Sequence, residues 1–257
     1  FRERKSVLGD IINSKPVHVG KPPFGYTDAG YAAFKTSQVN RKKVVYVGAY
    51  DGMLHALDAA TGEELWAYVP TAVMPNLYKL ADVKYGSNTS QPHTYFVDGK
   101  TVQGDVYING AWKTILVGGL NKGGRAYYAL DVTDPDAPEA LWEFTDDNLG
   151  LTYSDPVISK LADGTWTVAF GSGYNNVSPG DGKGRLFVVN AATGAVLRDI
   201  PTTAGSTATP SGMAKINVWV KSLSDNTAQR FYAGDLLGNL WRFDVDDLVA
   251  PKKGALL

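Results

Sequence analysis

Three histidines and several neighbouring carboxylates are the side chains of this 257-residue chain that could support catalysis or bind a metal. An imidazole can act as a general base or a metal ligand, and paired carboxylates hydrolyse glycosides. The candidates are His18, His55 and His93, together with Glu63 and Glu64, Asp134 and Asp136, Asp146 and Asp147, and Asp246 and Asp247. Each histidine stands alone, and the carboxylates fall in predicted turns or outer strands. We therefore predict packing or surface roles and no catalytic, cofactor-binding or metal residue.

Two other sequence features could indicate an enzyme, and neither is complete. The run DGKG at residues 181–184 resembles a phosphate-binding loop, but the leading glycine and the Ser or Thr after the lysine are missing. No Gly-x-Ser-x-Gly elbow singles out a serine nucleophile. The absence of cysteine excludes disulfides and thiolate metal sites, although it leaves the cellular compartment open. We predict a turn at residues 181–184 and a protein that is not an enzyme.

Bulk composition narrows the class of protein. Lys and Arg number 25 against 26 Asp and Glu, so the net charge of -1 offers no attraction to nucleic acid or to an anionic membrane. No apolar run approaches the roughly 18 to 20 residues that span a bilayer. The chain begins at Phe1 instead of Met and ends at Leu257. We expect a piece of a longer polypeptide, with any export signal outside this segment.

An internal repeat organises the elements that must position any site. Its clearest copy reads as a strand at 44–48, a turn, a strand at 53–58, the turn AATG at 59–62 and a strand at 63–66. Similar units follow near residues 114, 168 and 231, and short apolar runs such as 14–19 supply a fourth strand. Four antiparallel strands per unit are typical of a β-propeller blade.

The repeat therefore predicts an all-β fold with quinoprotein-like, four-stranded antiparallel blades. One β-propeller region covers residues 1–257, with blades at approximately 13–70, 93–145, 153–200 and 212–250 and a short helix near 73–82. We expect these four blades to be part of a larger propeller.

Two turns of the repeat have a defined chemistry. The side-chain oxygens of Asp58 and Asn190 can accept hydrogen bonds from backbone amides two or three residues further on. Gly62 and Gly194 end the same four-letter turn, AATG, and should adopt positive φ to close the hairpin. These four residues are predicted to be structural.

The string ALDAATGEELW at residues 56–66 resembles the repeat of propellers that include pyrroloquinoline-quinone dehydrogenases. In those enzymes the string docks one blade on the next, so the resemblance indicates fold and no cofactor. A quinoprotein-like dehydrogenase, with a quinone and a calcium ion beside a catalytic Asp, stays an alternative, as does a periplasmic propeller that assembles outer-membrane proteins. The vicinal cysteine pair of the dehydrogenases is impossible here.

A more specific resemblance rests on several motifs in a fixed order. They are LGDIINS at 8–14, YVGAYDGMLHA at 46–56, YFVDG at 95–99, WKTILVGGL at 112–120, ALDVTDP at 129–135 and YAGDLLGNLWRFD at 232–244. Over nearly its whole length the chain resembles the PilY/PilC family of type IV pilus tip-associated adhesin and assembly proteins. The resemblance implies the C-terminal β-propeller domain of a larger, secreted, non-enzymatic protein.

The same resemblance implies a location and partners. The protein would pass through the periplasm and lie extracellularly at the pilus tip or outer cell surface, supporting pilus assembly, twitching motility and adhesion. Its partners would be minor pilins or the pilus tip complex and a host or abiotic surface, with no nucleic acid and no membrane span in this segment. We expect exposed loops, such as residues 174–184 and 202–212, to make these contacts, because loops on a rigid frame carry function. An exposed edge strand could instead accept a partner strand.

The family also implies a regulatory calcium loop just before the Tyr-Ala-Gly-Asp strand, where alternating carboxylates supply the oxygen ligands that calcium prefers. The corresponding positions are Lys221, Leu223, Asp225, Thr227 and Gln229. Only one of them is a carboxylate, and one is a cation. We therefore predict that this degenerate loop binds no calcium and that the chain needs no cofactor.

Overall fold

The computed structural model describes residues 8–87, 89–246 and 254–256. These residues form four antiparallel sheets of four strands each, and consecutive strands pair in every sheet. We call them blades 1 to 4. Blade 1 contains β1 (Val17–Val19), β2 (Val44–Gly48), β3 (Leu54–Asp58) and β4 (Glu64–Tyr68), and blade 2 contains β5 (Thr101–Ile108), β6 (Ala111–Gly119), β7 (Tyr127–Asp131) and β8 (Glu139–Phe144). Blade 3 contains β9 (Val157–Lys160), β10 (Trp166–Gly171), β11 (Lys183–Asn190) and β12 (Val196–Gly205), and blade 4 contains β13 (Ile216–Val220), β14 (Ala228–Gly234), β15 (Leu240–Asp244) and β16 (Gly254–Leu256).

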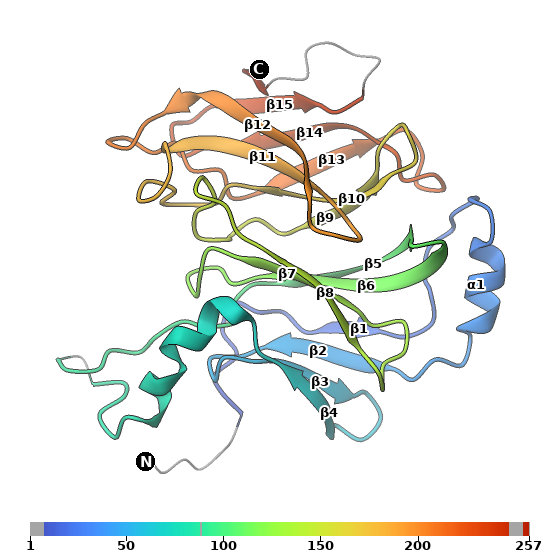
Figure 1. The fold of residues 1–257 in the computed structure, drawn as a ribbon, viewed down its shortest axis with the longest axis horizontal. Helices are drawn as coiled ribbons and strands as arrows, with labels where there is room; N and C mark the ends of the chain where they lie inside the picture. Colours follow the sequence, from blue (N-terminus) through green and yellow to red (C-terminus); the bar gives the residue numbers. More distant parts are fainter. Residues whose placement is uncertain (1–7, 88, 247–253, 257) are drawn as a thin grey trace.

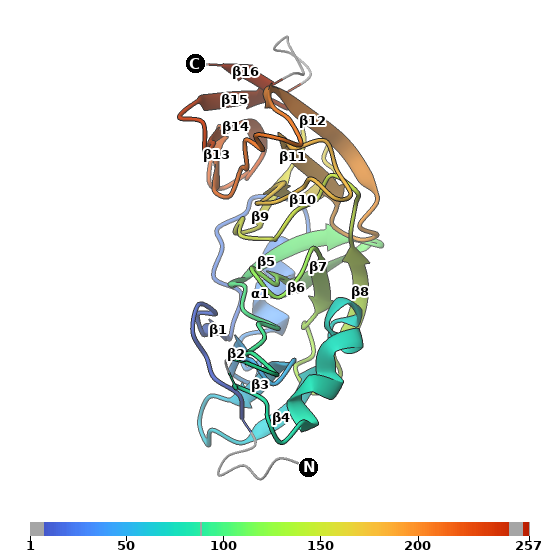
Figure 2. The same ribbon diagram turned by 90° about the vertical axis from the view of Figure 1, so that its left-hand side faces the viewer.

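The blades stack face to face in chain order. Figure 1 shows blade 1 at one end of the stack and blade 4 at the other, and Figure 2 shows the same stack from the side. The first strands of successive blades contact one another, β1 with β5, β5 with β9, and β9 with β13. This arrangement is an arc of propeller blades whose first strands share one side, so the fold is the predicted all-β propeller architecture.

The core lies between the blades. Tyr46 and Tyr128 are buried between blades 1 and 2, and the rings of Tyr127 and Phe170 stack with centroids 4.0 Å apart between blades 2 and 3. Phe231, Trp241 and Phe243 are buried between blades 3 and 4. Full burial of such a side chain contributes about 1.5 to 3 kcal/mol, which a single exposed blade would not gain. All five residues of β7 are buried, because blades cover both faces of this strand.

Tryptophan hydrogen bonds join neighbouring blades at their outer strands. Trp66 Nε1 donates to the carbonyl oxygen of Pro135 at 2.8 Å, which joins blade 1 to blade 2. Trp142 Nε1 donates to the carbonyl oxygen of Ala191 at 2.9 Å, which joins blade 2 to blade 3. At the strand position equivalent to Trp66 and Trp142, blade 3 has Arg198 in place of a tryptophan. The end of the ALDAATGEELW string thus contributes directly to blade docking.

Several boundaries differ from the sequence prediction. The predicted helix near 73–82 is a 3₁₀ helix, η1 (Thr71–Ala81), and it contains Pro75, which cannot donate a backbone hydrogen bond. The helix α1 (Tyr31–Ser37) was not predicted, because its seven residues give only one buried pair, Tyr31 and Phe34. Blades 3 and 4 extend beyond their predicted ends, since β12 continues to Gly205 and β16 lies at Gly254–Leu256. No helix within the described residues has the length and apolar character needed to cross a membrane.

Candidate functional site

The two AATG turns have the local geometry that their sequence predicts. Gly62 has φ of 78° and Gly194 has φ of 70°, both in the left-handed region. Asp58 Oδ1 accepts from the amides of Ala60 and Thr61 at 2.8 and 3.2 Å. Asn190 Oδ1 accepts from the amides at 192 and 193 at the same distances. These side chains act within their own hairpins.

Residues 221–227 connect β13 to β14, and Gln229 lies in β14; this stretch contains the five positions at which the family resemblance implies a calcium loop. Leu223 is 82% exposed, and Gln229 Nε2 donates to Asp246 Oδ2 at 3.3 Å. Thr227 pairs with the backbone of Lys160 in an isolated parallel bridge. Asp225 is the single carboxylate among the five positions. Its Oδ1 lies 2.8 Å from Lys160 Nζ. The structure therefore brings a second cation, unpredicted from the sequence, to this loop.

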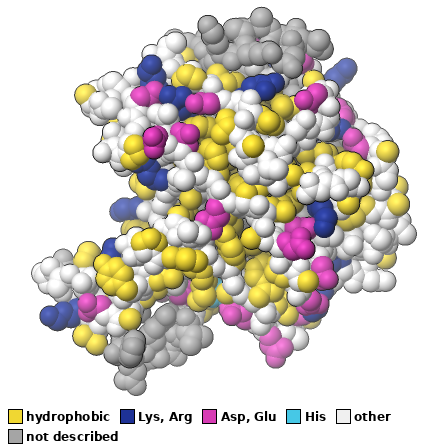
Figure 3. Space-filling model, in the orientation of Figure 1, with side chains coloured by type: hydrophobic (Ala, Val, Ile, Leu, Met, Phe, Trp, Pro, Cys, Tyr) yellow, Lys and Arg dark blue, Asp and Glu magenta, His cyan; other side chains and the backbone are white. Residues whose placement is uncertain are grey.

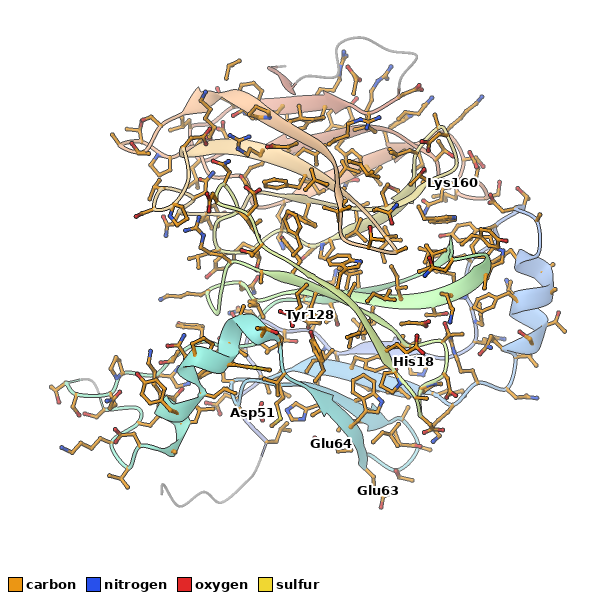
Figure 4. All side chains as sticks on the ribbon, in the orientation of Figure 1. His18, Asp51, Glu63, Glu64, Tyr128 and Lys160 are labelled. Atoms are coloured by element: carbon orange, nitrogen blue, oxygen red, sulfur yellow. The ribbon has the colours of Figure 1, made fainter. Side chains whose placement is uncertain are left out.

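Lys160 ends the first strand of blade 3, and its side chain is only 8% exposed. Its ammonium donates to Asp28 Oδ1 at 2.5 Å as well as to Asp225. Figure 4 shows Lys160 beside the upper two blades, far from Asp51 and Glu64. Burial alone would lower the pKa of Lys160, but the hydrogen bonds to Asp225 and Asp28 raise the pKa above its usual value. Lys160 is therefore held as a charged ammonium.

Backbone contacts fix the loop around this ion pair. The amide of Lys160 donates to the carbonyl of Asn226 at 3.0 Å, and the amide of Thr27 donates to the carbonyl of Ser224 at 2.9 Å. Asn226 has φ of 57°, and its Nδ2 donates to the carbonyl of Ile158 at 3.1 Å. The loop of blade 4 is thus attached to blade 3 and to the segment that leaves β1 of blade 1.

His55 lies in a cluster that the sequence reasoning missed. Its Nδ1 lies 2.5 Å from Glu64 Oε2, and its Nε2 lies 3.1 Å from both carboxylate oxygens of Asp51. Asp51 also accepts from the amide of Gly9 at 2.6 Å. The available signal was the spacing of Asp51 and His55, four residues apart across the tight turn between β2 and β3. Glu64 comes from the next strand, β4.

The electrostatics of this cluster favour a structural role. Burial would lower the pKa of His55, but hydrogen bonds to Asp51 and then to Glu64 raise the pKa above its usual value. Because carboxylates face both ring nitrogens, neither nitrogen is available to take a proton from a serine nucleophile. The cluster connects the segment around Gly9 to blade 1. Sequence analysis expected an isolated histidine, and the structure instead shows one with two carboxylate partners.

The other candidate residues are separate. His18 is exposed on β1, and His93 Nε2 lies 3.7 Å from Asp10 Oδ2. Lys42 forms an ion pair with Asp136. Asp246 was expected to be solvated, but only 6% of it is exposed, and its Oδ2 accepts from Gln229 Nε2; Asp247 lies outside the described residues. Among the residues that the structure describes, no three His, Asp or Glu side chains are grouped so that they could hold a metal ion.

The predicted binding loops are more firmly held than their sequences indicated. In residues 174–184, Asn176 is fully buried and its Nδ2 donates to the carbonyls of Asn148 and Lys183 at 3.1 and 2.8 Å. Arg125 donates to the carbonyls of Ser178 and Pro179 at 3.1 and 2.7 Å. The loop ends where β11 begins at Lys183. In residues 202–212, the first four belong to β12, and residues 206–212 lie in the connection to β13, which runs over 206–215.

Comparisons with known proteins point to one family. The family model for the PilY1 β-propeller domain matches residues 8–254. A type IV pilus biogenesis factor PilY1 homolog of Xylella fastidiosa is 42% identical over 258 residues, which cover 96% of this chain and 20% of that protein. The type IV pilus biogenesis factor PilY1 of Pseudomonas aeruginosa is 40% identical over 255 residues, covering 95% of this chain and 21% of that protein. The crystal structure of the Pseudomonas aeruginosa PilY1 C-terminal domain aligns with a TM-score of 0.73 and 35% identity, over 89% of this chain and 45% of that one. The chain therefore spans about a fifth of the length of the Xylella fastidiosa and Pseudomonas aeruginosa pilus biogenesis factors.

Proposed function

This chain belongs to the PilY1 β-propeller family, and on that premise we propose that it is a non-enzymatic scaffold in type IV pilus biogenesis. The observation that carries the proposal is the family match over residues 8–254, in which all four blades take part. Related proteins of this length and identity share a fold, and their printed names describe pilus biogenesis. The geometry of the loops adds a reason for a binding role.

The scaffold presents loops whose backbones are held in place. Arg125 fixes residues 178 and 179 through their carbonyl oxygens, so these backbone atoms are used internally while the exposed side chains of Asn175 and Ser178 face solvent. A loop ordered before binding loses less conformational entropy when a partner docks. We propose that residues 174–184 and 206–212 contact minor pilins or the pilus tip complex, and a host or abiotic surface.

The surface chemistry suits protein contacts more than nucleic acid. Figure 3 shows Lys and Arg side chains interspersed with Asp and Glu and with hydrophobic side chains across one face of the molecule. Mixed charge of this kind gives orientation and specificity at a protein interface without long-range attraction to a polyanion. We place the protein at the pilus tip or outer cell surface, reached through the periplasm, where adhesion and twitching motility would depend on it.

The proposal is tested by adding bulk and charge to the loops of the intact protein. Ser178→Arg and Thr207→Arg alter exposed side chains in the two loops, and Glu63→Arg alters an exposed turn of blade 1 as a matched control. Surface piliation, adhesion and twitching are measured at equal protein levels. We expect at least one loop variant to lower piliation or adhesion strongly while Glu63→Arg leaves both unchanged. Unchanged piliation and adhesion in both loop variants would remove these loops from the proposal.

A further inference from the structure

We propose that the ammonium of Lys160 is a permanent internal cation of residues 221–229, and that it replaces the calcium ion implied by the family resemblance. Lys160, Asp28 and Asp225 form this arrangement, which we call the lysine clamp. The clamp would hold the loop in one position whatever the calcium concentration. This inference goes beyond the proposed function, because it concerns how the loop is ordered and not what the protein binds.

The first argument is the position of the charge. Lys160 Nζ lies 2.5 Å from Asp28 Oδ1 and 2.8 Å from Asp225 Oδ1, within hydrogen-bond distance of both carboxylates. Asp225 is the carboxylate retained among the five positions of the calcium loop, so the ammonium binds the very group that would otherwise coordinate the metal. The hydrogen bond from Lys160 holds the pKa of Asp225 below its usual range.

The second argument is the donor set. Calcium takes six to eight oxygen ligands at about 2.3 to 2.6 Å, usually with several carboxylates. Here Lys221 and Leu223 contribute a cation and an apolar side chain, and the Gln229 side chain donates to Asp246. A divalent ion placed near Asp225 would also lie close to the ammonium of Lys160, which repels it. The residues present therefore do not fit a calcium ion.

The third argument is what the clamp connects. Asp28 lies in the long segment between β1 and β2, Lys160 ends β9, and Asp225 lies between β13 and β14, so three blades meet at one ammonium. The backbone hydrogen bonds from Lys160 to Asn226 and from Thr27 to Ser224 lie beside it. The aliphatic stem of Lys160 is buried, and Nζ lies 5.7 Å from the centre of the Trp166 ring, which favours a cation there. A lysine thus supplies both the charge and the packing of the site.

The first test measures amide hydrogen exchange in the intact protein with calcium and with a chelator. The probe is calcium chloride alone, and the readout is exchange of the amides at residues 222–227. The clamp predicts that residues 222–227 are equally protected in both conditions. Micromolar calcium binding that increases protection of these amides would overturn the proposal.

The second test removes the ammonium while keeping the length of the side chain. Lys160→Met should raise exchange at residues 222–227 by about tenfold or more, as expected for loss of charge-assisted hydrogen bonds. Lys215→Met is the matched control, because Lys215 is 67% exposed and its ion pair with Asp155 lies outside the loop. Equal exchange at residues 222–227 in wild type and Lys160→Met would overturn the clamp.

A third variant keeps the test decisive if Lys160→Met does not fold. Asp225→Asn keeps Lys160 and removes one charged partner at a site that is 45% exposed. It should increase exchange at residues 222–227 without creating calcium dependence, whereas unchanged exchange would contradict the proposal. None of these readouts involves piliation or adhesion, so their failure can be distinguished from failure of the proposed function.

Discussion

The AATG turns of blades 1 and 3 have the same four residues, at positions 59–62 and 191–194, in different surroundings. Both are closed by a glycine with positive φ and by a side-chain oxygen that accepts two amides. A Cβ added at Gly62 would meet no atom within 4 Å. A Cβ added at Gly194 would lie 2.9 to 3.1 Å from atoms of Trp142.

This difference separates the local from the tertiary contribution to a turn. The chemistry of Asp58 or Asn190 and the following glycine is sufficient to set the backbone of either hairpin. Only the stacking of blade 2 on blade 3 brings the Trp142 ring over Gly194, where its Nε1 also bonds the carbonyl of Ala191. Identical sequence thus yields one turn that is free at its glycine and one that is part of a blade interface.

Of the substitutions that test this comparison, Gly194→Ala should lower the free energy of unfolding most. An alanine backbone in the left-handed conformation costs about 1 to 2 kcal/mol of stability. The close contact of the new methyl group with the indole costs about 1 to 3 kcal/mol more. We expect a loss of about 2 to 5 kcal/mol in the free energy of unfolding, measured by urea denaturation. A loss no greater than that of Gly62→Ala would show that the Trp142 contact is unimportant.

Trp142→Phe should have an intermediate effect. It leaves the carbonyl of Ala191 without its indole donor and reduces packing at a buried ring, so we expect a loss of about 1 to 3 kcal/mol in the same assay. Trp66→Phe is the matched control at the half-buried interface of blades 1 and 2, and it should cost less. Trp142→Ala, which removes Cγ and Cδ2, should reduce the penalty of Gly194→Ala; strictly additive losses in this pair would contradict direct contact between the two residues.

Gly62→Ala should have the smallest effect of the three. Only the left-handed conformation is penalised, because space around the glycine is open, so we expect a loss of about 1 kcal/mol. The measurement is again urea denaturation, analysed for a change in midpoint without a change in slope. A loss as large as that of Gly194→Ala would mean that the two turns are equivalent in the folded protein.

Much of the architecture could be predicted from local signals. Short apolar runs separated by turn residues repeat in each blade, so the four-stranded units and the turn residues Asp58, Gly62, Asn190 and Gly194 follow from short stretches of sequence. The collinear motifs at 8–14 through 232–244 indicated the family that the comparisons confirm. The helix α1 escaped this reasoning because one buried pair in seven residues gives too weak a periodicity.

The ionic sites depend on tertiary structure for a physical reason. The partners of Lys160 come from two other blades, and Asp28 is 132 residues away in the chain, so no local pattern reports their approach. The residue types at the five positions within 221–229 were enough to show that only one carboxylate is present there. The stacking of blades decides that the ammonium of Lys160 lies beside Asp225, and whether a glycine faces solvent or an indole.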